Sequence, residues 1–570
     1  MNFTEWLEIG KVTVFAKRMD AVMTGIFSVS RVDLPLWHAA LVWAPALFAG
    51  VAAALVAGLA DERKGAVVAW RFARVASVLA LAAAVIGLVF VALGSVGVGY
   101  GARADLVGAL VMLLVAFVGW VIVRYSQTYL QGERREVHYV RWLMATLATV
   151  MVVVATDHLL VLALAWTATS LTLHHLLTFF GDRPAAVVAA HKKFIVARLA
   201  DVCMLSATAL LWIAFGTPSI HAMTAQASAA PLPGMVHVAV ALIAFTAVLK
   251  CAQLPFHGWL IQVMEAPTPV SALLHAGIVN LGGFVLLRFA PLVSGVPAAQ
   301  TLLVAVGAAT AVLAALVMTT RISIKVMLAW STCAQMGFML MQCGLGAWDM
   351  ALLHLLAHSL YKAHAFLGAG GAVRRAQMAQ LTPQAPAAGV SGTILGAATG
   401  VLMVLVAGAL WSLWAPGLAQ SPAMWVLAGV VSLALTPLVR VSSRGASWWA
   451  LAGGALCVAL AYFGLHVALG GWVGVPVAQP IAALWVGAGL AFALLFVLQS
   501  VVTLAPLGAL AQRLYPWFYG GLFLDEKFNS LAFSLWAPPA PAQQPTPLPS
   551  LAAAATQPAS LNPTASGVTP

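Results

Sequence analysis

The sequence predicts an all-α polytopic membrane protein, and three observations support this fold class. Of the 570 residues, 62% are hydrophobic and only 8% are charged, whereas a soluble domain carries about 25% charged residues. The mean hydropathy of the chain is +0.98. Apolar runs recur along most of its length, each close to the ~20 residues that a helix needs to cross ~30 Å of hydrocarbon. A water-soluble core is therefore excluded, and helices that cross a bilayer are expected.

The apolar runs define about fifteen transmembrane spans. They are predicted at 36–60, 73–98, 104–123, 141–156, 158–180, 195–215, 235–254, 268–290, 299–319, 322–345, 350–371, 391–415, 423–439, 447–468 and 482–504. The alternation of apolar and polar residues that is typical of strands is not seen. Residues 1–35 have no uninterrupted apolar core before a small-residue cleavage site, so no cleavable signal peptide is expected.

These spans divide the chain into six segments. In chain order they are an N-terminal segment, 1–35; the N-terminal helices, 36–156; a central core with most of the ionisable residues discussed below, 157–445; the C-terminal helices, 446–505; a segment that mixes aromatic and charged residues, 506–536; and an uncharged tail, 537–570. The fifth segment suits an interfacial helix or a docking site. The tail is dominated by Ala, Pro, Ser, Thr and Gln, so it is predicted to be disordered.

The net charge of +12 reflects membrane topology and requires no nucleic-acid partner. When the gaps between spans are labelled alternately, one set holds only Arg103 and Arg288. The other set holds Arg63, Lys64, Arg71, Arg74, Arg124, Arg134, Arg135, Arg141, Arg183, Lys192, Lys193, Arg321, Arg374, Arg375, Arg440 and Arg444. Because basic residues in short loops stay on the cytoplasmic side, the N-terminus is predicted outside and the C-terminus in the cytoplasm. Lys11, Lys17, Arg18 and Arg31 do not fit this orientation, so residues 1–35 either lie at an interface or contain a further span.

The most informative stretch surrounds Lys250. Roughly twenty apolar residues precede this lysine, and Pro255 and His257 follow it. Proline removes a backbone donor and clashes with the preceding turn, so the helix must break after the lysine. A broken helix at bilayer depth is tolerated only where protein or internal water satisfies the freed backbone groups. Because an ionisable residue at that depth is by default a candidate functional residue, the stretch is predicted to belong to an ion path.

A second cluster lies on one predicted helix, where His354, His358 and Lys362 are four residues apart. Each step of four residues turns the helix by 40° and rises about 6 Å, so the three side chains share one stripe. Neutral histidine can donate and accept a proton, and a desolvated lysine has a lowered pKa. The stripe therefore suits a proton relay. The alternative is a polar seam that only hydrogen-bonds neighbouring helices.

Other polar residues in the spans have two interpretations each. His275 lies in the middle of the next span and is predicted to belong to the path. Arg198 and Asp201 are three residues apart and could form a self-satisfied pair or take part in conduction. Lys325 could simply extend its amine to the membrane surface. Glu265 could gate the path or cap the following helix.

The chain offers no site for a metal or a redox cofactor. Its cysteines lie in apolar runs without CxxC spacing and are expected to be small buried hydrophobic residues; they are Cys203, Cys251, Cys333, Cys343 and Cys457. His174 and His175 are adjacent, so on a helix they point in different directions. No phosphate loop or nucleophile elbow is present. We therefore expect a transporter subunit and not an enzyme.

With these motifs in place, the chain resembles the proton-conducting membrane subunits of respiratory complex I and of multisubunit sodium/proton antiporters. The resemblance covers about 160–375 and is carried by Lys250 with residues 252–255, by residues 267–275, by residues 329–332 with 335–337, and by the His354/His358/Lys362 helix. It implies two inverted repeats, each with a broken helix, and a chain of Lys, His and Glu near the middle of the membrane. By position, Lys250 matches the central lysine of that family and His275 its bridging histidine.

The chain also departs from that pattern. Thr167 stands where complex I relatives carry the glutamate that pairs with the central lysine, and His174 and His175 follow it. The second broken helix, near 411–416, lacks the expected Lys or Glu, and a long lateral helix is not evident. With Asn280, these features resemble a separate branch, the DabB membrane subunit of DAB-type inorganic-carbon transporters of the bacterial inner membrane.

That resemblance implies a soluble, zinc-containing partner of the DabA type, similar to β-carbonic anhydrase, bound on the cytoplasmic face. The zinc is expected in the partner and no cofactor in this chain. Inward cation flow would then drive one-way hydration of CO₂ to bicarbonate. Two alternatives remain. One is an ion-pumping subunit of a complex I-like or antiporter complex, and the other is a membrane anchor that no longer conducts ions.

Overall fold

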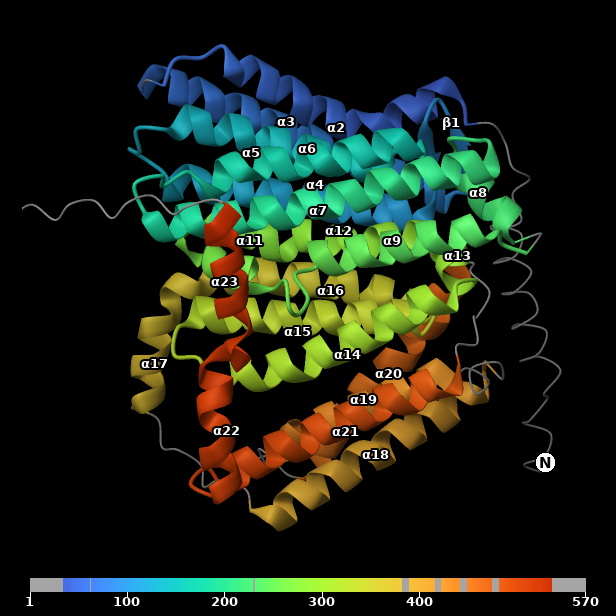
Figure 1. The fold of residues 1–570 in the computed structure, drawn as a ribbon, viewed down its shortest axis with the longest axis vertical. Helices are drawn as coiled ribbons and strands as arrows, with labels where there is room; N and C mark the ends of the chain where they lie inside the picture. The colour runs from blue at the N-terminus through green and yellow to red at the C-terminus, as the bar shows by residue number, and fades with distance from the viewer. Residues whose placement is uncertain are drawn as a thin grey trace, which may run out of the picture.

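The computed structural model describes residues 34–61, 63–228, 231–381, 389–415, 422–440, 448–473 and 481–535. Nearly all of them are helical, and the helices pack side by side in a bundle (Figure 1). Within these ranges, twelve helices are long and apolar enough to cross a membrane. The predicted fold class is confirmed, whereas the count of about fifteen spans and the inverted repeats stay predictions. The tail at 537–570 and nearly all of 1–35 lie outside the described residues.

The N-terminal part of the bundle contains six long helices. They are α2 (Leu36–Ala57), α3 (Arg63–Ala92), α4 (Leu106–Tyr129), α5 (Glu136–Ala155), α6 (Leu159–Leu177) and α7 (Pro184–Phe215). A short antiparallel hairpin, β1 (Gly97–Gly99) and β2 (Ala102–Ala104), joins α3 to α4. The short helix α8 (Ile220–Ala227) lies at the same end of the bundle as this hairpin (Figure 1).

The centre of the bundle contains interrupted helices beside continuous ones. They are α9 (Gly234–Lys250), α10 (Gly258–Gln262), η1 (Val263–Glu265), α11 (Thr268–Ala276), η2 (Ile278–Asn280), α12 (Leu281–Arg288), α13 (Ala290–Ser294), α14 (Pro297–Met318), α15 (Ile324–Gly344) and α16 (Trp348–Leu367). The interrupted segment Thr268–Arg288 is 94% buried inside the protein. Neighbouring helices therefore enclose its irregular backbone, as a bilayer requires.

The C-terminal part forms a separate layer and ends in two short helices. They are η3 (Gly368–Gly371), α17 (Ala372–Gln380), α18 (Val390–Ser412), α19 (Pro422–Arg440), α20 (Trp448–Val473), α21 (Ala482–Leu504), α22 (Ala509–Tyr519), η6 (Gly521–Phe523) and α23 (Leu524–Leu535). Figure 1 shows α22 and α23 running across the ends of the other helices. We call residues 509–535 the C-terminal arm. It occupies the predicted interfacial segment 506–536.

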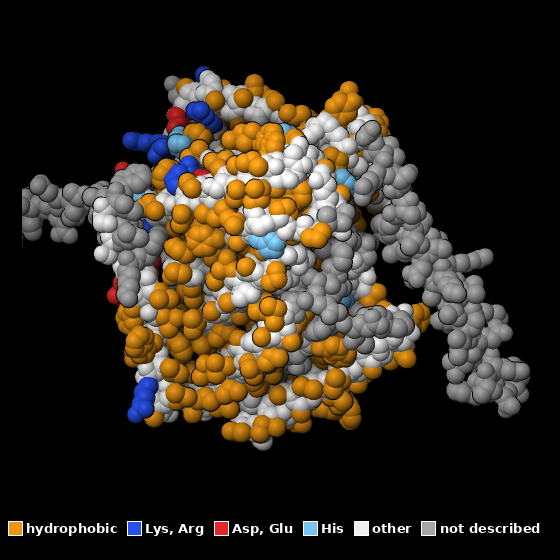
Figure 2. Space-filling view, turned by 45° about the vertical axis from the view of Figure 1, so that its right-hand side comes forward, with side chains coloured by type: hydrophobic (Ala, Val, Ile, Leu, Met, Phe, Trp, Pro, Cys, Tyr) orange, Lys and Arg blue, Asp and Glu red, His pale blue; other side chains and the backbone are white. Residues whose placement is uncertain are grey.

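The two ends of the bundle differ in charge. We define the basic face as the end that carries Arg63, Arg134, Arg183, Arg321 and Arg374, and the C-terminal arm crosses this end. Figure 2 shows charged side chains gathered on that side, while hydrophobic side chains cover the belt beside it. The apolar belt suits contact with lipid, and the basic face suits an aqueous surface.

Several predicted spans began too late in the sequence. The structure starts α3 at Arg63, α5 at Glu136 and α7 at Pro184, whereas apolar content alone placed these starts at 73, 141 and 195. The helices extend beyond their apolar cores, so basic residues assigned to loops lie on helical turns. Lys192 and Lys193 are the clearest correction, because both are buried inside α7.

Close packing in the centre depends on small residues. A Cβ added to Gly337 on α15 would lie only 2.6 Å from the carbonyl oxygen of Gly307 on α14, and the converse distance is also 2.6 Å. These two glycines let the backbones of α14 and α15 approach closely. In a membrane the lipid is as apolar as the side chains, so helices associate through such close packing contacts.

Candidate functional site

The break after Lys250 is present and is enclosed by protein. Helix α9 ends at Lys250, and the chain resumes as α10 only at Gly258. Between them Ala252 has a φ of 51°, a left-handed conformation that residues with a side chain seldom adopt. Such strain persists only where the surrounding structure holds it. The predicted interruption by Pro255 is therefore part of a fixed, buried feature.

Lys250 points into the protein and lies over an aromatic ring. Its side chain is 9% exposed, and its Nζ atom lies 4.4 Å from the centre of the Trp166 ring on α6. An ammonium at this distance is attracted to the face of an indole. The contact partly replaces the water that Lys250 loses, but it supplies no full negative charge.

The negative charge near Lys250 comes from Asp201 on α7. Asp201 pairs with Arg198 at 2.6 Å and lies close enough to Lys250 for direct Coulombic attraction. The side chain of Thr167 interacts with the same carboxylate. The position that carries glutamate in complex I relatives thus holds a threonine beside an aspartate from the next helix. Arg198 and Asp201 form the predicted pair, and the pair also faces the central lysine.

Lys193 is a further member of this cluster. From the sequence it was assigned to a loop and was not predicted to lie near Lys250. It donates hydrogen bonds to the backbone oxygen of Ser170 and, at 2.8 Å, to its hydroxyl oxygen. It also lies within Coulombic range of Lys250. A cavity of about 20 Å³ lies between Lys193, Asp201 and Lys250, which is room for one water molecule. The only sequence signal was a pair of lysines close to the start of an apolar run.

The stripe on α16 faces a matching polar stripe on α15. His354 Nδ1 lies 3.0 Å from Gln342 Oε1, and His358 Nδ1 lies 2.6 Å from Gln335 Oε1. The Lys362 amine donates to the Ser331 hydroxyl at 2.8 Å. All three predicted residues therefore turn toward a neighbouring helix, and the ring centres of the two histidines are 5.9 Å apart.

His275 joins this second cluster. It is fully buried and stacks on Phe366 with 4.4 Å between ring centres. Its backbone oxygen lies 3.2 Å from His358 Nε2, and Lys362 lies within Coulombic range of its ring. Neither ring nitrogen of His275 has a hydrogen-bond partner among the described residues. Two unpaired nitrogens at a buried site are suited to water, which commonly satisfies such groups.

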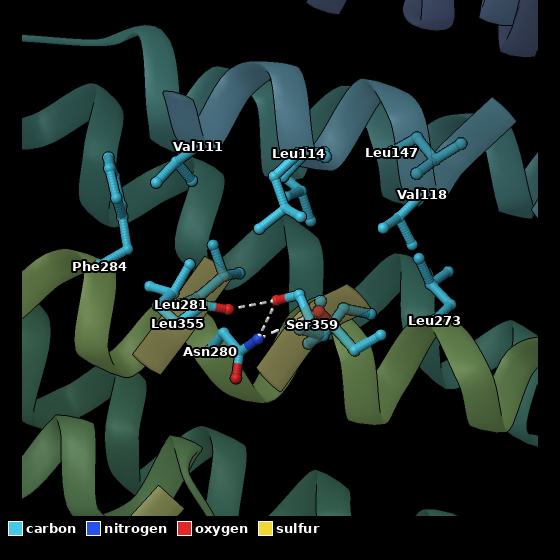
Figure 3. Close-up of a pocket in the computed structure, with 15 residues that line it drawn as sticks. Val111, Leu114, Val118, Leu147, Leu273, Asn280, Leu281, Phe284, Leu355 and Ser359 are labelled. Carbon is cyan, nitrogen blue, oxygen red and sulfur yellow. Dashed lines mark hydrogen bonds between the residues drawn. The ribbon is translucent and has the colours of Figure 1, made fainter. Parts of the chain in front are cut away.

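The two clusters meet at the interrupted helix α11–η2–α12. Ile278 lines both the cavity beside Lys250 and a second, mostly apolar cavity that reaches Ser359 on α16. Figure 3 shows the second cavity, in which Asn280 donates to the Ser359 hydroxyl at 2.6 Å. No direct hydrogen bond joins Lys250 to His275 among the described residues. Ile278 thus forms part of the wall of both cavities.

A third group of polar residues lies toward the basic face. His257 is buried and lies 4.8 Å from the Trp330 ring. Lys325 donates to Thr268 at 2.9 Å, so its amine is held by the start of α11. Glu265 lies 3.8 Å from Arg183, and both side chains are about half exposed. Glu265 makes no cap on α11, whose N-cap residue is Pro267 with no side-chain hydrogen bond.

The remaining predicted residues have separate surroundings. His175 stacks on Trp142 at 3.7 Å, whereas His174 packs edge-on against Phe194. The two adjacent histidines thus diverge, as their spacing predicts. Four of the cysteines are buried, but Cys457 is exposed, which corrects the expectation for that residue. Among the described residues no group of three His, Cys, Asp or Glu side chains could hold a metal ion.

The expected second broken helix is not seen in the described residues near 411–416. Helix α18 runs without interruption from Val390 to Ser412, and residues 416–421 lie outside the described ranges. The layer formed by α18–α21 contributes none of the side chains of the two clusters described above.

Comparison with known proteins identifies similar membrane subunits. Residues 155–409 match the family described as "NADH:quinone oxidoreductase/Mrp antiporter, TM". The chain is 54% identical over 277 residues to the probable inorganic carbon transporter subunit DabB of Hydrogenovibrio crunogenus, covering 48% of this chain and 54% of that protein. It is 38% identical over 436 residues to the probable inorganic carbon transporter subunit DabB2 of Halothiobacillus neapolitanus, covering 74% of this chain and 78% of that protein. The match thus spans about half of the first relative and most of the second.

The fold is also similar to solved structures of multisubunit membrane complexes. The Mrp complex from Dietzia sp. DQ12-45-1b matches with a TM-score of 0.51 and 24% identity, over 88% of this chain and 55% of that one. The membrane-bound sulfane sulfur reductase, an archaeal respiratory membrane complex, matches with a TM-score of 0.52 and 18% identity, over 86% and 99%. These two matches concern the arrangement of helices.

Proposed function

We propose a function from the premise that this chain belongs to the DabB family of inorganic carbon transporter subunits, within the wider group of complex I-like and Mrp-like membrane subunits. The chain is accordingly a multi-pass membrane subunit of a transporter. Its proposed activity is conduction of protons across the bacterial inner membrane, coupled to the hydration of CO₂ by a soluble partner.

The observation that supports conduction is the set of ionisable side chains enclosed by the bundle. Lys250, His275, His358 and Lys362 are all buried or nearly so. Burying an ionisable group costs free energy unless it is paired or serves a function. A membrane anchor has no use for these groups. Their amines and imidazoles face one another's helices and small cavities instead of lipid, which is the arrangement that stepwise proton transfer needs.

Conduction would proceed through two clusters. Lys250, with Asp201 and Lys193 around one water-sized cavity, forms the first. His275, Lys362, His358 and His354, lined by the hydroxyl and amide groups of α15, form the second. Water molecules beside Ile278, which lines a cavity next to each cluster, would connect them. Two neighbouring groups would not both be protonated and positively charged, because two positive charges at this depth repel each other strongly. The proton would therefore pass from one group to the next.

Coupling to carbon uptake follows from energetics. Hydration of CO₂ gives bicarbonate and a proton, and by itself the reaction only approaches equilibrium. One charge crossing 100 mV releases about 2.3 kcal/mol, which shifts an equilibrium by about fiftyfold. If the partner hydrates CO₂ only as a proton moves inward through this chain, the reaction becomes effectively one-way. The partner is proposed to be a β-carbonic-anhydrase-like protein of the DabA type on the basic face, where its zinc would activate the attacking water.

The test uses a bacterial host that lacks carbonic anhydrase and grows only with added CO₂. The chain is expressed with the soluble protein that co-purifies with it, and growth in air measures bicarbonate supply. We expect Lys250→Ala and Lys362→Ala each to abolish growth, whereas His237→Ala, a partly exposed residue in the first turn of α9 at the far end of that helix from Lys250, should leave it unchanged. Immunoblots establish equal amounts in the membrane. Full growth of both lysine variants would show an anchor that does not conduct. A flavin or iron–sulfur partner in place of a zinc protein would point to a respiratory complex.

A further inference from the structure

The C-terminal arm carries a carboxylate to a buried lysine of the central core. Both oxygens of Asp525, in the first turn of α23, lie 3.2 Å from the Lys192 amine on α7. The side chain of Lys192 is fully buried, whereas that of Asp525 is 29% exposed. The residues are 333 positions apart in the chain. The arm therefore brings a negative charge to a buried lysine of α7.

Asp525 also contacts α10, the helix that follows the break after Lys250. It accepts a hydrogen bond from Gln262 Nε2 at 2.9 Å. A Cβ added to Gly258, at the start of α10, would overlap the Asp525 carboxylate, so only glycine leaves room for it. His257, the preceding residue, lies within Coulombic range of both Asp525 and Lys192. The carboxylate thus sits where α7, α10 and the arm meet.

The exposed fractions of these side chains fall from the basic face toward the interior of the bundle. Asp525 has access to water at the basic face, while His257 and Lys192 are 1% and 0% exposed. Trp259, two residues after His257, lines the cavity between Lys193 and Lys250. Asp525 is thus the member of this group that is in contact with water. A second tether, from Arg321 to the backbone oxygen of Phe518 at 3.0 Å, holds the arm beside this point.

We infer that Asp525 is the residue through which protons pass between water at the basic face and the path that contains Lys250. Its carboxylate takes up a proton from water and passes it to His257 Nδ1, which has no hydrogen-bond partner among the described residues, or releases a proton in the opposite direction. When the Asp525 carboxylate is ionised, its ion pair with Lys192 holds it in this position. The inference rests on the proposed conduction.

The test replaces the carboxylate while keeping its shape. Asp525→Asn retains an acceptor for Gln262 but cannot carry a proton, so bicarbonate supply in the growth assay should fall by about a hundredfold or more, the lower end of the range for loss of a positioned acid–base group. Asp525→Glu keeps a carboxylate and should retain supply. Glu526→Gln alters the adjacent, exposed acid and is the matched control. Lys250→Ala is measured in parallel.

A double variant separates proton transfer from simple charge pairing. Asp525→Asn with Lys192→Met removes both charges, so no buried charge is left unpaired and the protein should accumulate in the membrane even if Asp525→Asn alone does not. If Asp525 carries protons, the double variant stays inactive. Recovery of supply in the double variant, or normal supply in Asp525→Asn, overturns the inference. Normal supply in Asp525→Asn together with loss in Lys250→Ala leaves the proposed function intact, whereas normal supply in Lys250→Ala overturns the proposed function itself.

Discussion

At the scale of single residues, the central lysine has an acid partner that its family position did not predict. Thr167 replaces the glutamate expected from complex I relatives, yet the Asp201 carboxylate of the neighbouring helix lies beside Lys250 and Thr167. The carboxylate near Lys250 thus comes from α7, whereas the family resemblance placed it on α6. The sequence shows the spacing of Arg198 and Asp201, but only the packing of α7 against α6 and α9 shows that this pair faces the lysine.

This arrangement predicts that a carboxylate at position 167 can replace the carboxylate of Asp201. Asp201→Asn removes the carboxylate that pairs with Arg198 and attracts Lys250, so a positive charge on the buried lysine becomes less favourable. Bicarbonate supply should therefore fall sharply in the growth assay. Asp201→Asn combined with Thr167→Glu returns a carboxylate to the same space, and supply should recover. Normal supply in Asp201→Asn, or no recovery in the double variant, would show that Lys250 needs no counter-ion here.

At the scale of helices, periodicity predicted the stripe of His354, His358 and Lys362 but not the residues that face it. The spacing of His354, His358 and Lys362 placed them on one face of α16, and the structure confirms that all three contact α15. Gln342 was not predicted to belong to the site. A single amide in an apolar run shows no periodic pattern, and its contact with His354 becomes clear only when the facing helix is known. The contact of the arm with α7 was also beyond prediction, because it joins residues that are far apart in the chain.

A second ionic contact between helices, at the end opposite the basic face, gives a pH-dependent prediction. Asp105, which caps α4, pairs with the buried Arg288 at the end of α12. Burial opposes ionisation of Asp105, but Arg288, Arg103 and the backbone N–H of Gly108 outweigh it and lower its pKa to about 2. A carboxyl with a lowered folded-state pKa stabilises the protein above its ordinary pKa, 3.8, and loses that contribution as the pH falls through the folded value.

Asp105→Asn should therefore lower the unfolding temperature of the purified protein near neutral pH. The lost contribution amounts to about 2 kcal/mol. The difference from the native chain should shrink as the pH falls below about 4 and vanish near pH 2. Thermal unfolding in detergent at a series of pH values measures it, with the exposed Asp182→Asn as control. A difference that stays constant over this range would mean that the ionised carboxylate contributes nothing.

At the scale of the whole molecule, composition was enough to predict the fold class, and hydropathy located the long helices. Helix starts were less accurate, because α3, α5 and α7 begin with turns that contain charged residues, which apolar content does not register. Of the candidate site, the two clusters around Lys250 and on α16 were predictable from local motifs. The lining of two cavities by Ile278 and the contact of Asp525 with Lys192 depend on long-range packing, and no local pattern encodes them.

The central claim is that protons cross the bundle along its buried ionisable residues while CO₂ is hydrated. The most direct measurement reconstitutes the purified complex of this chain and its soluble partner in vesicles with a pH-sensitive dye and an imposed membrane potential. We predict proton movement across the vesicle membrane that depends on added CO₂ and is absent from Lys362→Ala vesicles. Hydration of CO₂ at the native rate with no proton movement, or equal movement in the Lys362→Ala vesicles, would contradict the account.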